Sequence, residues 1–187
     1  MHAASLVARF AEAADSNDPM NAAKAVLEDL SSKRDAVADA LAYLSGTGGN
    51  ANQAFYRSPN LSLLKVSFPN GRRTPPHNHG TWAAILVLSG KEKNTLYLPE
   101  GGGLRRVSEV ELEPGSILPM RAEAVHVAEC IGDEPAIGLH VYGANVLGVE
   151  RQMWDPDTLE AHPLDWSKYE GFAQRASSAS CAPLAGT

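Results

Sequence analysis

Residues 71–90 read GRRTPPHNHGTWAAILVLSG, a pair of histidines followed by a long apolar run. His77 and His79 flank Asn78, so on an extended strand both imidazole rings point to the same face. Each neutral imidazole offers a nitrogen to a divalent metal of intermediate softness. Two prolines stiffen the chain before the pair, and the apolar run WAAILVLSG after it has the composition of a buried strand. The stretch therefore predicts a strand-rich domain that carries a pair of metal ligands.

Strand-like runs continue on both sides of this stretch, separated by turns rich in Gly and Pro. Leu64, Val66 and Phe68 alternate with polar residues, which is the period of a half-buried strand. No helical repeat lies between the runs, so a parallel sheet with crossover helices is disfavoured. Many short strands with frequent turns favour a sandwich or a barrel. The later predicted strands are 82–90, 93–98, 104–112, 116–120, 124–130 and 136–143.

The pattern divides the chain into three segments. We expect residues 1–47 to form a helical segment packed on the barrel, and residues 53–149 to form the β-barrel with the metal site. Residues 150–187 are expected to form a C-terminal arm over the barrel. Its tail, 174–187, is small, polar and poor in aromatic residues, which predicts disorder.

Capping signals define the helices of the first segment. Pro19 follows Asp18, which is a favourable helix start with proline at the first helical position. Ser32 is expected to cap a further helix, which Gly46 would close. These signals predict helices without any residue that points to chemistry.

Composition narrows the possible partners. The 187 residues carry a formal net charge of −6 and contain no basic run, which argues against nucleic acid and anionic membranes. No apolar stretch reaches the length of a membrane span. The cysteines Cys130 and Cys181 are far apart and form no CxxC, which fits a reducing compartment. Because Arg9 and Glu12 interrupt the apolar N-terminus, we expect a helix there instead of a signal peptide, and a cytoplasmic protein.

The spacing from Gly71 to Gly90, G-x5-H-x-H-x10-G, resembles the first motif of the cupin family, and His126 stands where the second motif would place a third histidine. The resemblance implies a double-stranded β-helix, a jelly-roll barrel. The first motif also expects a glutamate ligand, but its position falls on Ala83 or Ala84. Three neutral imidazoles without a carboxylate would leave the full charge on the metal, which favours an anionic ligand such as a thiolate.

Two blocks, residues 75–97 and 126–143, resemble the cysteine dioxygenase branch of the cupins, the thiol dioxygenases. The resemblance implies that His77, His79 and His126 bind Fe(II), although Ni or Zn are possible in isolated protein. It also implies that His140 and Tyr142 are catalytic, with Tyr142 near the open metal positions. The animal enzymes cross-link this tyrosine to a cysteine, and the alanines at 83 and 84 leave no such partner here.

The expected activity is an Fe(II)-dependent oxidation of a small thiol, such as cysteine or 3-mercaptopropionate, to a sulfinate with O₂. The family places an arginine after a tyrosine upstream of the histidine pair, so Arg57 is the expected partner of the substrate carboxylate. Arg72 and Arg73 compete for this role. Two alternatives stay open: a cupin dioxygenase that cleaves a carbon–carbon bond, and a non-catalytic cupin that binds a metal or a small ligand. The sequence defines neither the thiol nor the oligomeric state.

Overall fold

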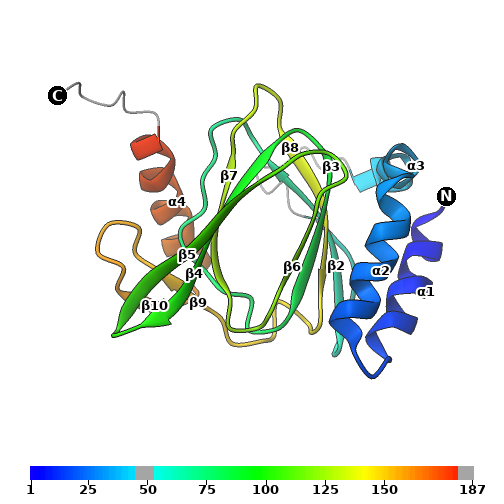
Figure 1. Ribbon diagram of the computed structural model, residues 1–187, viewed down its shortest axis with the longest axis horizontal. Helices are drawn as coiled ribbons and strands as arrows, with labels where there is room; N and C mark the ends of the chain where they lie inside the picture. Colours follow the sequence, from blue (N-terminus) through cyan, green and yellow to red (C-terminus); the bar gives the residue numbers. More distant parts are fainter. Residues whose placement is uncertain (45–52, 181–187) are drawn as a thin grey trace.

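The computed structural model describes residues 1–44 and 53–180, a β-barrel with helices on two opposite sides (Figure 1). The N-terminal helices are α1 (Ala3–Ala14), α2 (Pro19–Ser31), α3 (Arg34–Ala40) and the short 3₁₀ helix η1 (Ala42–Leu44), and α4 (Trp166–Ser180) lies on the opposite side. The strands are β1 (Gln53–Ser58), β2 (Leu61–Phe68), β3 (Ala83–Ser89), β4 (Glu92–Glu100), β5 (Gly103–Leu112), β6 (Ile117–Met120), β7 (Val125–Cys130), β8 (Ala136–Tyr142), β9 (Gln152–Trp154) and β10 (Ala161–Pro163).

The strands of the barrel form two antiparallel sheets. The first has the order β1-β2-β8-β3-β6, and the second has the order β5-β4-β7. Strand β8 pairs with both β2 and β3, so strands far apart in the sequence lie side by side. Short antiparallel strands wound into two facing sheets make a double-stranded β-helix. The predicted cupin-type, mainly β fold with an N-terminal helical segment is therefore confirmed, and β1 is a strand that the sequence pattern missed.

Strand β3 is buried on both faces, which explains its continuous apolar sequence. Successive residues of a strand point to opposite faces, so β3 contributes to two separate apolar clusters. One face packs against α1, α2 and α3, and the other faces the barrel interior. The outward set is Ala84, Leu86 and Leu88, and the inward set is Ala83, Ile85 and Val87.

The capping signals predicted the start of α2 correctly but not the start of α3. Asp18 caps α2 by accepting a hydrogen bond from the backbone N–H of Asn21, and Pro19 is the first helical residue. The prediction that Ser32 caps the next helix is wrong. Ser32 follows α2, and its hydroxyl donates to the backbone oxygen of Asp29, so it belongs to the end of the earlier helix. Gly46 lies outside the described residues.

The C-terminal arm is more regular than the sequence indicated. Strands β9 and β10 pair as a hairpin, and α4 extends through residues 174–180, where we predicted disorder. The physical reason is an apolar stripe at helical spacing that the small, polar composition concealed. Its buried members are Tyr169, Phe172, Ala173 and Ala176. Residues 181–187, with Cys181, lie outside the described part of the chain.

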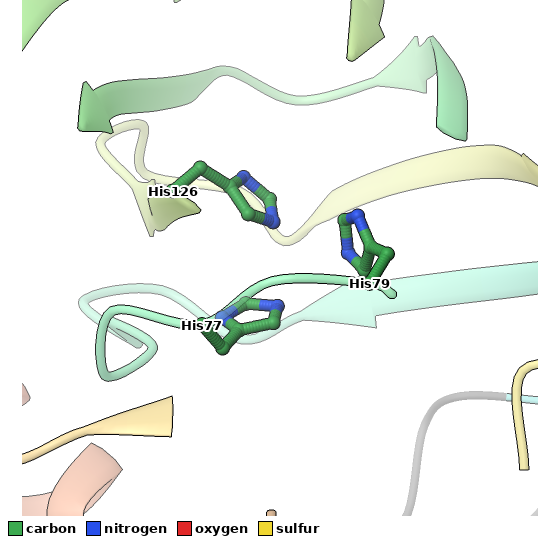
Figure 2. A group of neighbouring side chains, drawn as sticks. All are labelled: His77, His79 and His126. Atoms are coloured by element: carbon green, nitrogen blue, oxygen red, sulfur yellow. The ribbon is translucent and has the colours of Figure 1, made fainter. Parts of the chain in front are cut away.

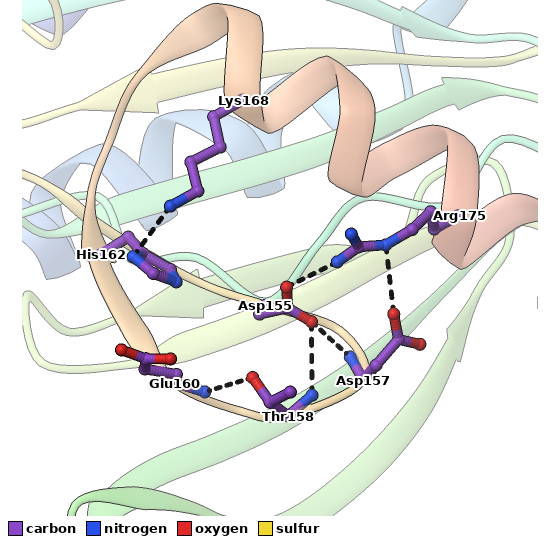
Figure 3. Close-up of polar contacts among 7 residues, drawn as sticks. All are labelled: Asp155, Asp157, Thr158, Glu160, His162, Lys168 and Arg175. Carbon is purple, nitrogen blue, oxygen red and sulfur yellow. Dashed lines mark hydrogen bonds and ion pairs between the residues drawn. The ribbon is translucent and has the colours of Figure 1, made fainter.

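Ion pairs hold α4 against the hairpin (Figure 3). Arg175 Nη2 lies 2.6 Å from the Asp155 carboxylate, and its Nε lies 3.1 Å from that of Asp157. Asp155 also accepts hydrogen bonds from the backbone N–H groups of Asp157 and Thr158. The Asp155 carboxylate therefore both shapes the loop and holds the helix in place.

Among the helices in residues 1–44 and 53–180, none is long and apolar enough to cross a membrane.

Candidate metal centre

Backbone hydrogen bonds place His77 opposite His126. The N–H of His77 donates to the backbone oxygen of His126 at 3.0 Å, and the N–H of His126 donates back at 2.9 Å. This isolated antiparallel bridge joins the segment before β3 to strand β7. Residues 49 positions apart in the chain are thereby held as direct neighbours, and their ring centroids lie 4.5 Å apart.

The His79 ring completes a cluster of three imidazoles (Figure 2). Its centroid lies 5.3 Å from that of His77 and 4.9 Å from that of His126. One ring nitrogen from each residue can be chosen so that all three atoms lie within 4.8 Å of one another. All three side chains are buried. Such a group can hold a metal ion, as the HxH spacing and the third histidine predict.

Hydrogen bonds fix which nitrogen faces the cluster for two of the rings. The Nδ1 of His77 lies 3.0 Å from the backbone oxygen of Pro75, which can only accept, so Nδ1 carries the proton. The Nδ1 of His126 lies 2.7 Å from the side-chain oxygen of Asn94. In both rings Nε2 is then the unprotonated nitrogen that a metal needs. The Nε2 of His126 is buried without a hydrogen-bond partner among the described residues, as expected for a ligand atom.

The cluster favours neutral imidazoles. Burial lowers the pKa of His77 and His79 well below the ordinary value, and the proximity of His126 adds to the effect. Burial likewise lowers the pKa of His126 to about 3, with a further contribution from the positive charge of Arg151. Neutral rings leave the metal-binding nitrogens free at neutral pH.

Pairing within the sheet shows which of the two alanines, Ala83 or Ala84, stands at the position where the first motif expects a glutamate. Ala84 faces the N-terminal helices, whereas Ala83 faces the barrel interior and pairs with Tyr142 across strands β3 and β8. Ala83 is therefore the inward position, and its methyl group offers no ligand atom. The cluster of His77, His79 and His126 contains no carboxylate.

Tyr142 and His140 lie beside the cluster on strand β8. The Tyr142 ring centroid is 5.0 Å from that of His79, and its hydroxyl is 3.0 Å from Nδ1 of His140. Burial raises the pKa of Tyr142 above its ordinary value and lowers the pKa of His140 to about 3. Gly138 makes room for the imidazole, because a Cβ there would lie 2.9 Å from Nε2 of His140. Gly138, His140 and Tyr142 lie on one face of β8, whereas Leu139 and Val141 pack on the other face toward the N-terminal helices.

Two residues of strand β4 support His126, and the sequence pattern did not reveal them. Asn94 Nδ2 donates to the Glu92 carboxylate at 2.7 Å, which turns the amide oxygen of Asn94 toward His126. Glu92 and Asn94 are both buried, and burial raises the pKa of Glu92 to about 7. They lie in the polar sequence KEKN, residues 91–94, which is typical of the exposed start of a strand.

A cavity of about 480 Å³ runs from the histidine cluster to the surface. Arg57 contributes to its lining from an exposed position at the edge. Arg72 also lines it, but its guanidinium pairs with the Glu170 carboxylate at 2.9 Å. Arg73 is not part of the lining, and its backbone N–H donates to Ser177. Of the three candidate arginines, two therefore reach the cavity and one of these has a carboxylate partner.

Arg151 is a third arginine in the lining of this cavity, and sequence reasoning missed it. Its Nε donates to the backbone oxygen of Asn78, between the two histidines of the HxH pair. Its positive charge lowers the pKa of His77, His79 and His126, and burial lowers its own pKa. Strand β9 brings it there by pairing beside the HxH segment: Asn78 donates to the backbone oxygen of Gln152. No local motif marks this position.

Trp82 and Cys130 lie close in sequence to the histidines but do not line the cavity. The Trp82 ring packs over Gly143, where a Cβ would meet its Nε1 at 2.0 Å, and it contacts the helical side of the barrel. Cys130 is a buried free thiol whose Sγ lies 3.3 Å from the backbone oxygen of Glu134. Both side chains therefore pack in apolar clusters away from the histidines.

The search for related proteins yields solved cupin structures but no matching family model. The cupin domain of Schizosaccharomyces pombe Cnp3 overlaps with a TM-score of 0.42 and 13% identity, over 51% of this chain and 65% of that domain. An RmlC-like cupin family protein from Methanocaldococcus jannaschii overlaps with a TM-score of 0.43 and 12% identity, over 55% of this chain and 88% of that protein. Hydroquinone 1,2-dioxygenase from Sphingomonas sp. TTNP3 overlaps with a TM-score of 0.44 and 13% identity, over 55% of this chain and 72% of that enzyme.

Identities this low transfer no activity to the chain. The protein is a double-stranded β-helix with the architecture of cupins, and three buried histidines in its barrel are placed to bind a metal ion.

Proposed function

We propose that this protein is an Fe(II)-dependent thiol dioxygenase. The observation that carries the proposal is the cluster of three buried, neutral histidines with Tyr142 against His79 and an alanine in the glutamate position. The reaction adds both atoms of O₂ to the sulfur of a thiol, which gives a sulfinate and releases the thiol proton. Its partners are a thiol substrate and O₂.

The histidines fit the metal that this chemistry requires. His77, His79 and His126 would hold Fe(II), which would supply open coordination positions for a thiolate and O₂. Ni or Zn would occupy the same nitrogens if the host supplied them, because affinity alone does not select iron. A site without a carboxylate keeps the full positive charge of the ion, and this favours a thiolate.

Tyr142 is proposed to donate a hydrogen bond to the reacting oxygen, and His140 is proposed to orient the Tyr142 hydroxyl. Because burial raises the pKa of Tyr142, its hydroxyl keeps its proton at neutral pH and can donate a hydrogen bond to an oxygen atom in the cavity. His140 Nδ1, 3.0 Å from that hydroxyl, orients it. Both side chains are buried, so bulk water does not compete for these bonds.

A cation beside the metal selects an acidic thiol. Arg151 has no carboxylate partner among the described residues, and its planar guanidinium suits bidentate binding of a substrate carboxylate. We assign it this role ahead of Arg57, which lies exposed at the cavity edge. A reduced thiol substrate and a free buried cysteine both fit the cytoplasm.

Oxygen uptake with a panel of thiols tests the proposal. Iron-loaded protein should consume one O₂ per thiol and yield the sulfinate from 3-mercaptopropionate or cysteine. Uptake with catechols or diketones alone would instead identify a dioxygenase that cleaves carbon–carbon bonds. Absence of uptake with every compound, despite bound iron, would leave a non-catalytic cupin. Metal analysis of His77→Ala and His126→Ala checks the ligands separately, because full occupancy in either variant contradicts the assignment.

A further inference from the structure

The cavity is much larger than a small thiol acid requires. Its volume of about 480 Å³ is more than ten times the ~30 Å³ that one water molecule occupies in the liquid. Volumes of roughly 300–1,000 Å³ are typical of sites for larger organic ligands. If a thiolate lies at the histidines and a carboxylate at Arg151, most of this space remains for another part of the ligand.

Apolar side chains make up much of the remaining wall. An apolar wall contributes favourably to the free energy of ligand binding only when the ligand has apolar surface that the wall can remove from water. Strand β2 and the residue after it contribute one part, and the segment after β8 contributes another. The apolar lining residues are Leu64, Val66, Phe68, Pro69, Val146 and Leu147.

Helix α4 adds aromatic rings that lead from the surface to the metal ligands. The Trp166 ring centroid lies 5.4 Å from that of Tyr169, and Tyr169 lies 5.5 Å from His77. Tyr169 is buried, whereas Trp166 is 50% exposed and Leu147 is 58% exposed. Large apolar side chains are therefore left in water at the mouth of the cavity, where a bound ligand would cover them.

Trp166 also contacts the cation that we assign to the carboxylate. The Arg151 guanidinium carbon lies 5.7 Å from the centroid of the Trp166 ring, within the range of a cation–π contact. The aromatic surface and the positive charge thus adjoin one another. A ligand with a carboxylate and a neighbouring aryl or alkyl group matches both.

We propose that the natural substrate is a thiol carboxylate with a bulky apolar body, aryl or branched alkyl, which packs against Trp166 and Leu147. This inference rests on the proposed function and narrows its substrate class. Cysteine and 3-mercaptopropionate bind as truncated substrates that leave the apolar wall uncovered.

Two matched thiols test this class. 2-Benzyl-3-mercaptopropionate keeps the thiol-to-carboxylate spacing of 3-mercaptopropionate and adds only a benzyl group. Its kcat/KM for oxygen uptake should exceed that of the parent by about tenfold to a hundredfold, the range for removing one benzyl-sized group from water. An equal or lower value for the benzyl compound contradicts the inference and leaves the dioxygenase proposal intact.

Binding without turnover separates the two proposals. Calorimetry on the iron-loaded protein under anaerobic conditions compares 3-phenylpropionate with propionate, neither of which carries a thiol. Affinity at least tenfold higher for 3-phenylpropionate supports the apolar site. Equal affinities overturn it, whatever the thiols do. Tight binding of 3-phenylpropionate combined with no oxygen uptake from any thiol supports the apolar site and overturns the dioxygenase.

Variants locate the apolar contact. Trp166→Ala should reduce the affinity ratio of 3-phenylpropionate to propionate at least threefold, and Leu147→Ser gives a second test if the helix tolerates no change. Because both ligands carry the carboxylate, the ratio does not depend on Arg151. Leu98→Ala is the matched control, since Leu98 is an exposed apolar residue that does not line the cavity. An unchanged ratio in both cavity variants contradicts the assignment.

Discussion

The side-chain oxygen of Asn94 lies 2.7 Å from Nδ1 of His126, and both side chains are buried inside the barrel. The amide cannot turn over freely, because its Nδ2 donates to the Glu92 carboxylate at 2.7 Å. The proton of His126 is therefore held on Nδ1, and Nε2 points into the cluster as an acceptor. Asn94 is a positioning residue for a metal ligand and does not contact the metal.

Asn94→Leu should weaken metal binding while leaving all three histidines in place. Partners that orient a metal-bound histidine are commonly worth about 10- to 100-fold in metal affinity, so we expect a loss in that range. Competition with a chelator of known affinity measures it. Asn60→Ala is a matched control on the surface, where the asparagine contacts Asp15. Equal affinity of Asn94→Leu and the parent would reduce Asn94 to a packing residue.

Glu92 makes the stability of the metal-free protein depend on pH. Burial raises its pKa from 4.5 to about 7, so between these values the folded state keeps a proton that the unfolded state has lost. The contribution of Glu92 to stability therefore falls as the pH rises through this window and does not change further above it. The gap corresponds to a cost of about 3 kcal/mol at ~1.4 kcal/mol per pH unit.

Glu92→Gln removes this cost and keeps an oxygen that Asn94 can donate to. In chelator-treated protein the variant should be more stable than the parent at pH 8, and the difference should vanish below about pH 4.5. Urea unfolding across the pH range measures the effect. A stability difference that is the same at pH 4.5 and pH 8 would show that Glu92 does not titrate in this window.

Strand alternation and the resemblance to the cupin motifs were together enough to predict the metal ligands but not the residues that support them. Alternation in a strand is a local property, so it places His77 and His79 on one face. His126 was predicted from its resemblance to the second cupin motif, and only the folded sheet brings it opposite His77. Alternation does not tell which face of a strand is inside, so it gave no sign that Glu92 and Asn94 are buried. Arg151 depends on the pairing of β9 beside Asn78, a contact between segments about 70 residues apart.

Tyr142→Phe should lower turnover while metal content and stability change little. Only a hydroxyl is removed, and its neighbours His79 and Ala83 keep their packing. The expected fall in kcat is roughly 10- to 1,000-fold, the range for a group that donates a proton or stabilises developing charge. Steady-state oxygen uptake with metal analysis of the same sample measures both quantities. A variant as fast as the parent would exclude the hydroxyl from the reaction.

The last prediction separates the two arginines that reach the cavity without a carboxylate partner among the described residues. Arg151→Gln should raise KM for 3-mercaptopropionate roughly 30- to 150-fold, because a charge-assisted bidentate contact is worth about 2–3 kcal/mol. The same change should alter KM for propane-1-thiol, which has no carboxylate, much less. Arg57→Gln is the matched control, and its exposed position predicts a change of less than about threefold for either thiol.

The comparison between the two thiols is what assigns the carboxylate, since loss of charge beside the histidines would affect both substrates alike. Arg151 lowers the pKa of all three histidines, so its removal should also make them somewhat easier to protonate. Metal content measured at pH 6 and pH 8 detects that effect independently of the substrate. If Arg57→Gln instead selectively raises KM for the thiol acid, the carboxylate binds at the edge of the cavity.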